Sequence, residues 1–499
     1  MSARQDSDNL AWDQSDELWE KTMKQVRLSS VCRKIEAFAE KIFANPGPMI
    51  TPLIIGGFNV LYPFRVEGRN VLIRMPCPNQ ALFPEEKTLS EAATAAFISQ
   101  HTQVPVPKLL NHGVDPDIGP FMVIEDLGTR RCMSDVLETP REDPNDVPVL
   151  NPDIPETKLR SVYLAVARLV LQLAQPSFPR IGSLLESAGT FDVAARPVTL
   201  NMSNMVQLAN IPRSILPSKD TTYHIADEWY TALADMHIAT LLFQHNDMIS
   251  SEDDCRTKYV ARQLFRRLAK QGRLSTFGFA EDNWSALASA HQNEASEARL
   301  PAPDGAGAFR LWSDDFRPVN ILVNEQDTIV GAIDWEFAYV APTQFALDPP
   351  WWLLLDVPEM WDDGIDDWTK VYEGRLETWL SAMEEAEQDP ALGPDFLLLS
   401  AYMRESWSTG RFWLNYAARK SWAFDTIYWK YLDERFFGKR EEGVPADELW
   451  KTRVELLRED ERAAMESMMQ IKMEESTKRV LVEWEADDAR KRLSAFLFD

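Results

Sequence analysis

The segment Leu311–Glu336, LWSDDFRPVNILVNEQDTIVGAIDWE, decides the fold prediction for this chain of 499 residues. Asn320 follows Asp315 after five residues, and Asp334 comes fourteen residues later. The alternation of apolar residues around a polar turn predicts a β-hairpin over 319–335, with Asp334 at the far end of its second strand. Folding the hairpin brings Asp334 beside Asn320, where a carboxylate and an amide offer the oxygen ligands that Mg²⁺ prefers. Asp315 is then free to accept a proton from an alcohol.

The part of the chain before this segment alternates between helical and strand patterns. Apolar positions at helical spacing over 12–45 predict one or two amphipathic helices. A period of two over 60–75, broken by a turn at Glu67–Asn70, predicts a β-hairpin. A helix is expected over Ser90–Gln100 and a strand over Phe121–Ile124. This order of elements predicts a small α+β lobe.

The segment 311–336 resembles the catalytic segment of protein-kinase-like phosphotransferases, in the branch of aminoglycoside phosphotransferases and choline kinases, and is similar especially to fungal-type members. In that family an HxDxxxxN loop precedes a strand that ends in IDWE, and Gly331–Glu336 reads GAIDWE. The resemblance implies that Asp315 is the catalytic base and that Asn320 and Asp334 hold magnesium. It further implies ATP as the phosphate donor and a hydroxyl as the acceptor.

Two positions depart from the family pattern. The family histidine falls at Ser313 and the following glycine at Asp314, so a second carboxylate stands beside Asp315. Serine can still bond the backbone of the loop, so loss of activity does not follow. Two alternatives stay open: Asp315 and Asp334 as turn and cap residues of a structural hairpin, or a catalytically degenerate protein that binds a nucleotide or metabolite. A protein kinase ranks well below these, because no APE-like anchor follows Asp334 at activation-loop spacing.

The resemblance also implies roles for residues of the small lobe. Residues 56–59, Gly-Gly-Phe-Asn, join two strands where a kinase covers the ATP phosphates, and glycine permits positive φ and close approach of the backbone. Arg74 shares a strand face with Leu72 and stands where the family lysine grips phosphate. Glu91 would open the next helix and pair with Arg74; alternatively Ser90 is the N-cap and Glu91 only favours the helix dipole. The predicted cofactor-binding residues are Gly56, Gly57, Phe58, Asn59, Arg74, Glu91 and, at the hinge to the second lobe, Glu125, Asp126 and Leu127.

The composition excludes several other classes of protein. Lysine and arginine number 52 and aspartate and glutamate 78, a net charge of −26, which disfavours nucleic-acid binding. The four cysteines form no CxxC pair, so a disulfide scaffold or zinc site is not expected. The polar, acidic N-terminus is not a signal peptide, and no apolar run approaches the ~20 residues of a membrane helix. We therefore predict a cytoplasmic protein with no nucleic-acid or membrane partner.

These observations predict an α+β, bilobal, protein-kinase-like fold with ATP and Mg²⁺ as cofactors and a small-molecule hydroxyl as the acceptor, whose identity and the oligomeric state stay open. The expected parts are an N-terminal helical extension (1–50), an N-lobe (51–127), a mainly helical C-lobe (128–435) and a C-terminal helical extension (436–499). The aromatic-rich stretch Trp407–Phe437 is either a wall of the acceptor site or, as we favour, helix core. The pattern over 446–498 predicts a long charged helix with a solvated face.

Overall fold

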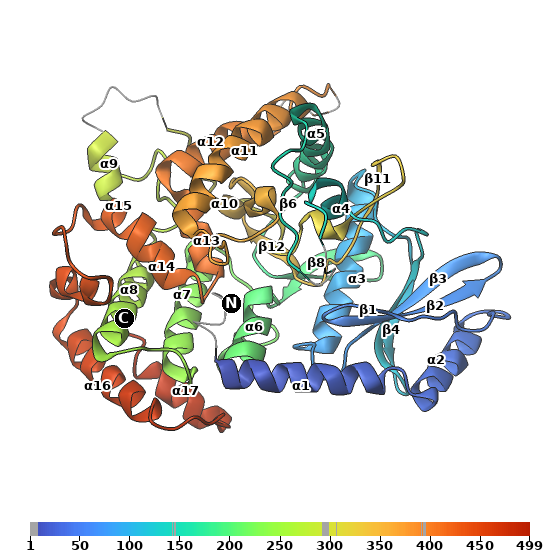
Figure 1. Cartoon of the computed structure of the whole chain (residues 1–499), viewed down its shortest axis with the longest axis horizontal. Coiled ribbons are helices and arrows are strands. Elements are labelled where there is room, and N and C mark those ends of the chain that lie inside the picture. Colours follow the sequence, from blue (N-terminus) through green and yellow to red (C-terminus); the bar gives the residue numbers. More distant parts are fainter. Residues whose placement is uncertain are drawn as a thin grey trace.

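The computed structural model describes residues 8–499 except for 142, 144–145, 292–298, 306, 391 and 393–395. A sheet-containing lobe lies on the right of Figure 1, and a larger, mostly helical lobe lies on its left. The α+β bilobal architecture predicted from the sequence is confirmed. Residues 1–7 of the predicted N-terminal extension lie outside the described residues.

The N-lobe is built on five antiparallel strands in the order β1-β2-β3-β5-β4. Their bounds are β1 (Ile54–Ile55), β2 (Asn59–Val66), β3 (Arg69–Pro76), β4 (Leu109–Asp115) and β5 (Gly119–Glu125). Val66 pairs with Arg69, so the turn between β2 and β3 is shorter than the predicted turn over 67–70. Glu67 and Gly68 have φ of 50° and 80°, and positive φ at both central residues gives a turn whose twist matches the paired strands.

Helix α3 (Pro84–His101) packs against β4 and β5. It begins six residues before the expected start at Ser90, so the alternative that Ser90 is the N-cap is wrong, and Glu91 lies within the helix. The missed first turn contains Pro84, whose fixed φ suits a helix start, and two glutamates that favour the positive end of the dipole. Their polarity hides this turn from a search for apolar periodicity.

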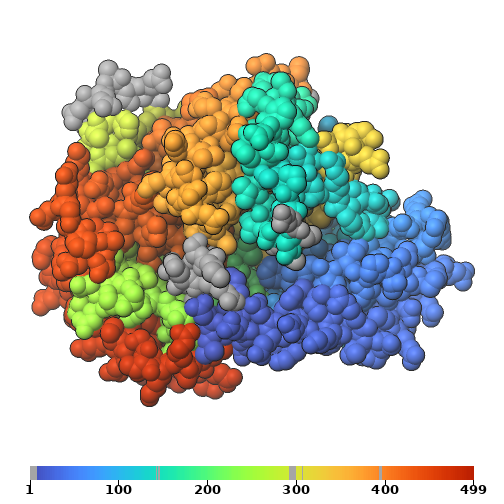
Figure 2. Space-filling model, in the orientation of Figure 1, coloured from blue at the N-terminus to red at the C-terminus, as the bar shows by residue number. Residues whose placement is uncertain are grey.

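Two helices precede the sheet, as predicted over 12–45: α1 (Asn9–Gln25) and α2 (Ser29–Ile42). Helix α1 runs along one edge of both lobes in Figure 1, and this N-terminal part forms a continuous band in Figure 2. Its N-cap Asp8 accepts a 2.9 Å bond from the Asn246 amide of the C-lobe. At the other end, the carbonyl of Val26 accepts a 3.2 Å bond from the Tyr62 hydroxyl of β2. The helix therefore contacts both lobes independently of the hinge.

In the part of the C-lobe that the structure describes, there are helices and three small sheets. Its longer helices are α5 (Glu156–Leu173), α6 (Leu200–Ala209), α7 (Ala226–Phe243), α8 (Glu252–Lys270), α11 (Ile365–Ala386), α12 (Leu399–Thr409) and α13 (Arg411–Arg419). The shorter ones are α4 (Met133–Leu137), α9 (Ala286–His291), α10 (Thr343–Ala346), α14 (Phe424–Ile427) and α15 (Asp433–Phe437). One sheet orders β12 (Ala338–Pro342), β9 (Phe309–Ser313) and β6 (Ser177–Phe178), and a separate hairpin pairs β7 (Ser183–Ser187) with β8 (Thr190–Ala195).

The predicted hairpin of the decisive segment is present as β10 (Ile321–Val323) and β11 (Ile329–Ala332). Both strands are shorter than expected. Residues 318–320 form a single 3₁₀ turn, with Pro318 at its first position. Asp334 lies two residues beyond β11, in the left-handed region with φ of 66°. The predicted site residues thus lie on the connections at the ends of the hairpin.

The long helix predicted over 446–498 is wrong in its extent. The structure has 3₁₀ turns at Ala446–Thr452 and Val454–Leu456, and two helices, α16 (Glu459–Glu475) and α17 (Ala486–Ser494). Helix α16 packs against α8 and buries Met465 and Met468, so only its outer face is solvated. Among the described residues, none of the helices has both the length and the apolar character needed to cross a membrane.

Candidate active site

One cavity of about 470 Å³ between the lobes brings together every site residue predicted from the sequence. It is lined by Gly56, Gly57, Phe58, Asn59, Arg74, Glu91, Glu125, Asp126, Leu127, Asp315, Asn320 and Asp334, among others. The N-lobe contributes the β1–β2 turn, β3, α3 and the hinge, and the C-lobe contributes the connections around β10 and β11. Side chains that are far apart in sequence therefore face the same space.

Asp315 is held in place by three neighbours. The Ser313 hydroxyl accepts a bond from the Asp315 backbone N–H at 3.3 Å, so this serine does bond the backbone of the loop. Asn320 Nδ2 donates to Asp315 Oδ2 at 3.0 Å, and Arg317 Nε donates to Oδ1 at 2.7 Å. Burial raises the pKa of Asp315, against the pull of Arg317, and the Asp334 carboxylate raises it further. A raised pKa makes this carboxylate a better proton acceptor.

The neighbouring carboxylate, Asp314, faces away from the cavity. Its Oδ1 lies 3.1 Å from Arg419 Nε and accepts a 3.1 Å bond from the Trp312 indole N–H. Arg419 is buried and stacks over Trp312 and Phe345 in the C-lobe. Of the two adjacent carboxylates, Asp315 lines the cavity and Asp314 belongs to the interior of the lobe.

Asp334 and Asn320 lie side by side, as predicted, because the Ile333 backbone N–H donates to the Asn320 carbonyl at 2.9 Å. Asn320 uses its Nδ2 on Asp315, while its Oδ1 makes no hydrogen bond with any residue that the structure describes. The amide is thus fixed with its acceptor oxygen available. The left-handed backbone of Asp334 is costly for a residue other than glycine, and such conformations gather at functional sites.

Arg74 connects the lobes at the centre of the cavity. Its Nη2 lies 2.9 Å from Glu91 Oε1 and 2.6 Å from Asp334 Oδ1, so the ion pair predicted between Arg74 and Glu91 is present. Burial opposes the charged form of Arg74, but the two carboxylates outweigh it and keep its pKa above the ordinary value. Burial also raises the pKa of Glu91, and Arg74 opposes that rise.

The glycine-containing turn differs from the prediction in its backbone. Neither Gly56 nor Gly57 is among the residues with positive φ, so the expected use of left-handed angles there is wrong. The turn is instead closed by a 2.8 Å bond from the Gly56 N–H to the Asn59 carbonyl. A Cβ at Gly57 would meet no atom within 4 Å. The glycines therefore leave open space beside the cavity rather than relieving a strained turn.

The hinge encloses the other end of the cavity. Glu125 ends β5, and the Asp126 N–H donates to the Asn70 carbonyl at 3.0 Å. The Gly128 N–H donates to Asp126 Oδ1 at 3.0 Å, which orders the backbone after the strand. Apolar side chains from both lobes line this end: Leu61, Leu72, Met122, Ile124, Leu127, Leu322 and Ile333. The result is an apolar slot adjoining a charged end.

Sequence reasoning missed Arg317, Lys87 and Glu336. Arg317 stands two residues after Asp315 and lines the cavity. Lys87 of α3 forms a short ion pair with Glu336, the last residue of the IDWE motif, and its Nζ lies 3.0 Å from Asn59 Oδ1. Glu336 belongs to the IDWE motif, but the motif alone indicates no role for it. Lys87 lies in the polar first part of α3, where apolar periodicity does not indicate a helix.

The aromatic stretch Trp407–Phe437 does not line the interlobe cavity. Trp413 is 3% exposed and stacks on Tyr431 with ring centroids 4.1 Å apart, and Phe412 packs against Trp413 at 5.0 Å. The favoured interpretation as helix core is confirmed for the buried rings. Trp422 lines a separate cavity of about 20 Å³ inside the C-lobe.

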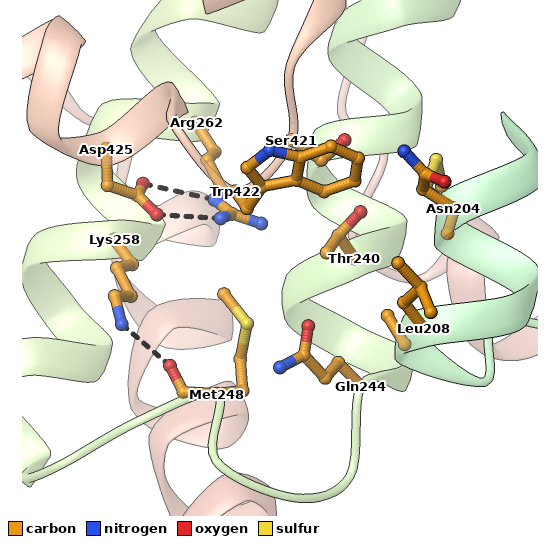
Figure 3. A pocket seen from close by; sticks show the side chains of 12 residues that line it. Asn204, Leu208, Thr240, Gln244, Met248, Lys258, Arg262, Ser421, Trp422 and Asp425 are labelled. Atoms are coloured by element: carbon orange, nitrogen blue, oxygen red, sulfur yellow. Dashed lines mark hydrogen bonds and ion pairs between the residues drawn. The ribbon is translucent and has the colours of Figure 1, made fainter. Parts of the chain in front are cut away.

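That internal cavity, between α6, α7 and α8, is shown in Figure 3. Its charged groups are engaged with one another or with the backbone. Arg262 forks onto Asp425 with bonds of 3.1 and 2.7 Å, and Lys258 Nζ donates to the Met248 carbonyl at 2.7 Å. The interlobe cavity differs in this respect, because Asn320 Oδ1 makes no hydrogen bond with any described residue and could accept one from, or coordinate, a ligand.

Residues 211–388 match the model of the phosphotransferase enzyme family, a range that includes Asp315, Asn320 and Asp334. No curated protein matches the sequence of this chain.

Similar solved structures include three kinases of small molecules, all at low identity. The aminoglycoside phosphotransferase APH(4)-Ia is 14% identical, with 79% of this chain and 98% of that chain covered and a TM-score of 0.39. The macrolide 2′-phosphotransferase type I is 13% identical, with 82% of this chain and 96% of that chain covered and a TM-score of 0.39. The Plasmodium vivax ethanolamine kinase is 10% identical, with 89% of this chain and 93% of that chain covered and a TM-score of 0.40. Because these values are low, the assignment rests on the family match and on the chain's own residues. The expected resemblance is thereby confirmed: residues 211–388 are similar to the phosphotransferase enzyme family.

Proposed function

We propose that this protein is an ATP- and Mg²⁺-dependent phosphotransferase that phosphorylates a hydroxyl group of a small molecule. The observation that carries the proposal is the contact between Arg74 and Asp334, 260 residues apart, beside Asp315 and Asn320 in the same cavity. In this proposal residues 51–127 cover the nucleotide and residues 128–435 carry the catalytic groups and the acceptor site. The segments 1–50 and 436–499 are extensions of these two lobes.

The donor set of the cavity fits a magnesium–nucleotide complex. Asn320 Oδ1 is oriented by the bonds of its own Nδ2 to Asp315, and Asp334 supplies a carboxylate next to it. Oxygen ligands of this kind suit Mg²⁺, which usually takes one or two protein carboxylates and completes its shell with waters and phosphates. When bound, the ion would neutralise phosphate charge. The apolar slot at the hinge offers its backbone groups and its walls to a flat heterocycle such as adenine.

The chain's own residues then divide the work of phosphoryl transfer. Asp315 orients the acceptor hydroxyl and takes its proton, and its raised pKa suits that task. Arg74 stays cationic between Glu91 and Asp334 and offers its guanidinium to the phosphates. Positioning and charge neutralisation supply most of the acceleration in this class of reaction. Arg317 keeps Asp315 in place through the 2.7 Å bond.

The proposal is tested first at the level of binding. Titration calorimetry with ATP and Mg²⁺ should show binding to the wild type. In the Asp334→Ala variant, the part of the affinity that depends on Mg²⁺ should be lost. Binding that is unaffected by the substitution, or by chelation of the ion with EDTA, would contradict the assignment of Asp334.

Turnover is tested with a screen of acceptors. ATP consumption by the purified protein is measured against aminoglycosides, choline, ethanolamine, homoserine and sugars, with Asp315→Asn as the control. Acceptor-dependent consumption that disappears in the control supports the proposed enzyme and identifies its acceptor class. Nucleotide binding without any consumption, across an extended acceptor panel, would instead support a degenerate protein that binds the nucleotide as a module.

A further inference from the structure

A buried ion pair joins the lobes beside the cavity, and its carboxylate, Glu336, lines the cavity 4.0 Å from Arg74 Nη2. Lys87 of α3 and Glu336 of the segment after β11 are 249 residues apart, and both side chains are 1% exposed. Lys87 is not among the residues that line the cavity. A direct contact of its ammonium with the nucleotide is therefore not the explanation for its position.

Asn59 completes a closed triangle with these two residues. Its Nδ2 donates to Glu336 Oε2 at 3.0 Å, and its Oδ1 accepts from Lys87 Nζ at 3.0 Å. Asn59 is the first residue of β2 and directly follows the turn at 56–58. An aromatic contact runs parallel to the triangle, because the rings of Phe58 and Phe337 meet edge to face at 5.1 Å. The turn is thus connected to the 336–337 segment at two successive positions.

Stability alone does not account for a buried charge at this point. Transferring a lysine ammonium out of water is costly, and well-packed apolar residues often stabilise a fold as well as a buried ion pair does. Burial lowers the pKa of Lys87 to about 8, opposed most strongly by Glu91. What the ion pair does supply is a fixed geometry among three elements: α3, the 56–59 turn and the segment that carries Asp334. Glu336 lies two residues after Asp334, so a constraint on one is passed to the other.

We propose that Lys87, Glu336 and Asn59 are positioning residues that hold the 56–59 turn at a fixed distance above Asp334. This inference rests on the proposed function, since it concerns the space in which the phosphates would bind. In the triangle Lys87 is the central donor, Glu336 fixes the triangle to the metal-binding segment, and Asn59 fixes it to the turn. Removing any one member breaks two of the three contacts of the triangle and so loosens the turn, without touching the apolar slot at the hinge.

The experiment compares two ligands in one set of variants. Lys87→Met keeps a side chain of similar length and removes the charge, and we expect it to weaken Mg²⁺–ATP binding about tenfold while leaving adenosine binding unchanged. The matched control is Lys41→Met, which removes another lysine–carboxylate pair of the N-lobe, with Asp115, from a side chain that is 64% exposed. This control should bind both ligands as the wild type does. A general loss of structure would weaken both ligands alike, so the difference between them separates positioning from folding.

Two further variants keep the proposal open to refutation if Lys87→Met does not fold. Asn59→Leu leaves the Lys87–Glu336 pair in place and removes its link to the turn, so it should also weaken Mg²⁺–ATP binding selectively. In a double-mutant cycle, Asn59→Leu should add little to the loss caused by Glu336→Gln. Folded variants that bind Mg²⁺–ATP as tightly as the wild type would overturn the positioning role. A wild type that binds adenosine but gains nothing from the phosphates and Mg²⁺ would overturn the proposed function itself.

Discussion

The interlobe cavity and the aromatic region of the C-lobe are two dense clusters of conspicuous side chains, but they are built differently. In the cavity, Arg74 reaches carboxylates on α3 and on the segment after β11, far apart in sequence. In the aromatic region, rings from 407–437 pack mainly on one another and on the neighbouring helix α11. Polar groups that line the cavity still face open space, whereas the aromatic rings leave little space between them.

The candidate site differs from the aromatic region because its polar groups come from distant parts of the sequence and line a cavity. The run of aromatic residues suggests a binding site in the sequence, but in the structure most of its rings pack against other apolar side chains in the core. The charged residues of the candidate site are scattered through the sequence, and only the folded structure shows that they lie in one cavity. The following substitutions test this comparison, beginning with the largest expected effect.

The strongest test uses the two adjacent carboxylates at the border of the cavity. Asp315→Asn removes the proton acceptor and should lower turnover about 10²–10⁴-fold with nucleotide affinity retained. Asp314→Asn breaks the buried contact with Arg419 and should instead lower the free energy of unfolding, by about 3–5 kcal/mol. Acceptor-dependent kinetics and thermal unfolding distinguish the two. Equal losses of turnover in folded forms of both variants would show that the base is wrongly assigned.

The aromatic region should respond in stability only. Trp413→Ala removes a ring that is 3% exposed and stacked on Tyr431, so we expect a loss of about 3–5 kcal/mol in the free energy of unfolding. Denaturant unfolding gives that value. Titration below the unfolding transition should return the wild-type affinity for Mg²⁺–ATP. A specific loss of acceptor binding in the folded variant would restore the interpretation of this stretch as an acceptor wall.

A buried carboxylate beside the aromatic region, Asp348, should make the stability of the C-lobe depend on pH. Asp348 accepts bonds from Ser406 and Asn415, and burial raises its pKa to about 6 from 3.8, against the pull of Arg419. The folded state therefore holds this proton more tightly than the unfolded chain. Its contribution to stability falls as pH rises from about 4 to about 6, by up to about 3 kcal/mol.

Asp348→Asn should remove this pH dependence. Relative to the wild type, the variant should gain stability as the pH is raised from 4 to 7, as followed by urea unfolding at each pH. A difference between the two proteins that stays constant over this range would mean that Asp348 does not titrate there. Tyr230 and Tyr372, which also face Asp348, stay neutral over this range, because burial raises the pKa of each.

The smallest expected effect concerns the identity of the cation at the centre of the cavity. Arg74→Lys retains the charge but cannot contact Glu91 and Asp334 through a planar fork, so we expect about tenfold weaker binding of Mg²⁺–ATP. Arg74→Met, which removes the charge as well, should bind still more weakly. Calorimetry on both variants gives the order. Wild-type affinity in Arg74→Met would exclude a role for this cation in phosphate binding.

Much of the fold could be predicted from local patterns, and so could the proximity of Asp334 and Asn320. The small-lobe residues of the site followed from the family resemblance, and Arg317, Lys87 and Glu336 were not predicted. The hairpins carry a period of two, and Asp315, Asn320 and Asp334 stand at a spacing that a short hairpin converts into proximity. Local pattern fails where tertiary contacts decide the outcome. The first turn of α3 is missed because its residues are polar, although one of them, Lys87, is buried against a residue 249 positions away.

The C-terminal region fails for a similar reason. Its charges keep a helical spacing across a break that the sequence does not mark strongly, between Glu475 and Ala486. The choice between Asp314 and Asp315 also required the structure, because the two are neighbours in sequence. Asp314 contacts Arg419 in the interior of the lobe, whereas Asp315 lines the cavity.

Helix α1 has a consequence for how the two lobes can move. It touches the C-lobe through Asp8 and Asn246 and the N-lobe through Val26 and Tyr62, while the chain crosses between lobes again at 125–128. Together with the contacts of Arg74 and Lys87 between the lobes, these two connections leave the lobes little freedom to twist or slide relative to one another. Any widening of the interlobe cavity would then require α1, a helix of 17 residues, either to move with the N-lobe or to give up one of its two contacts.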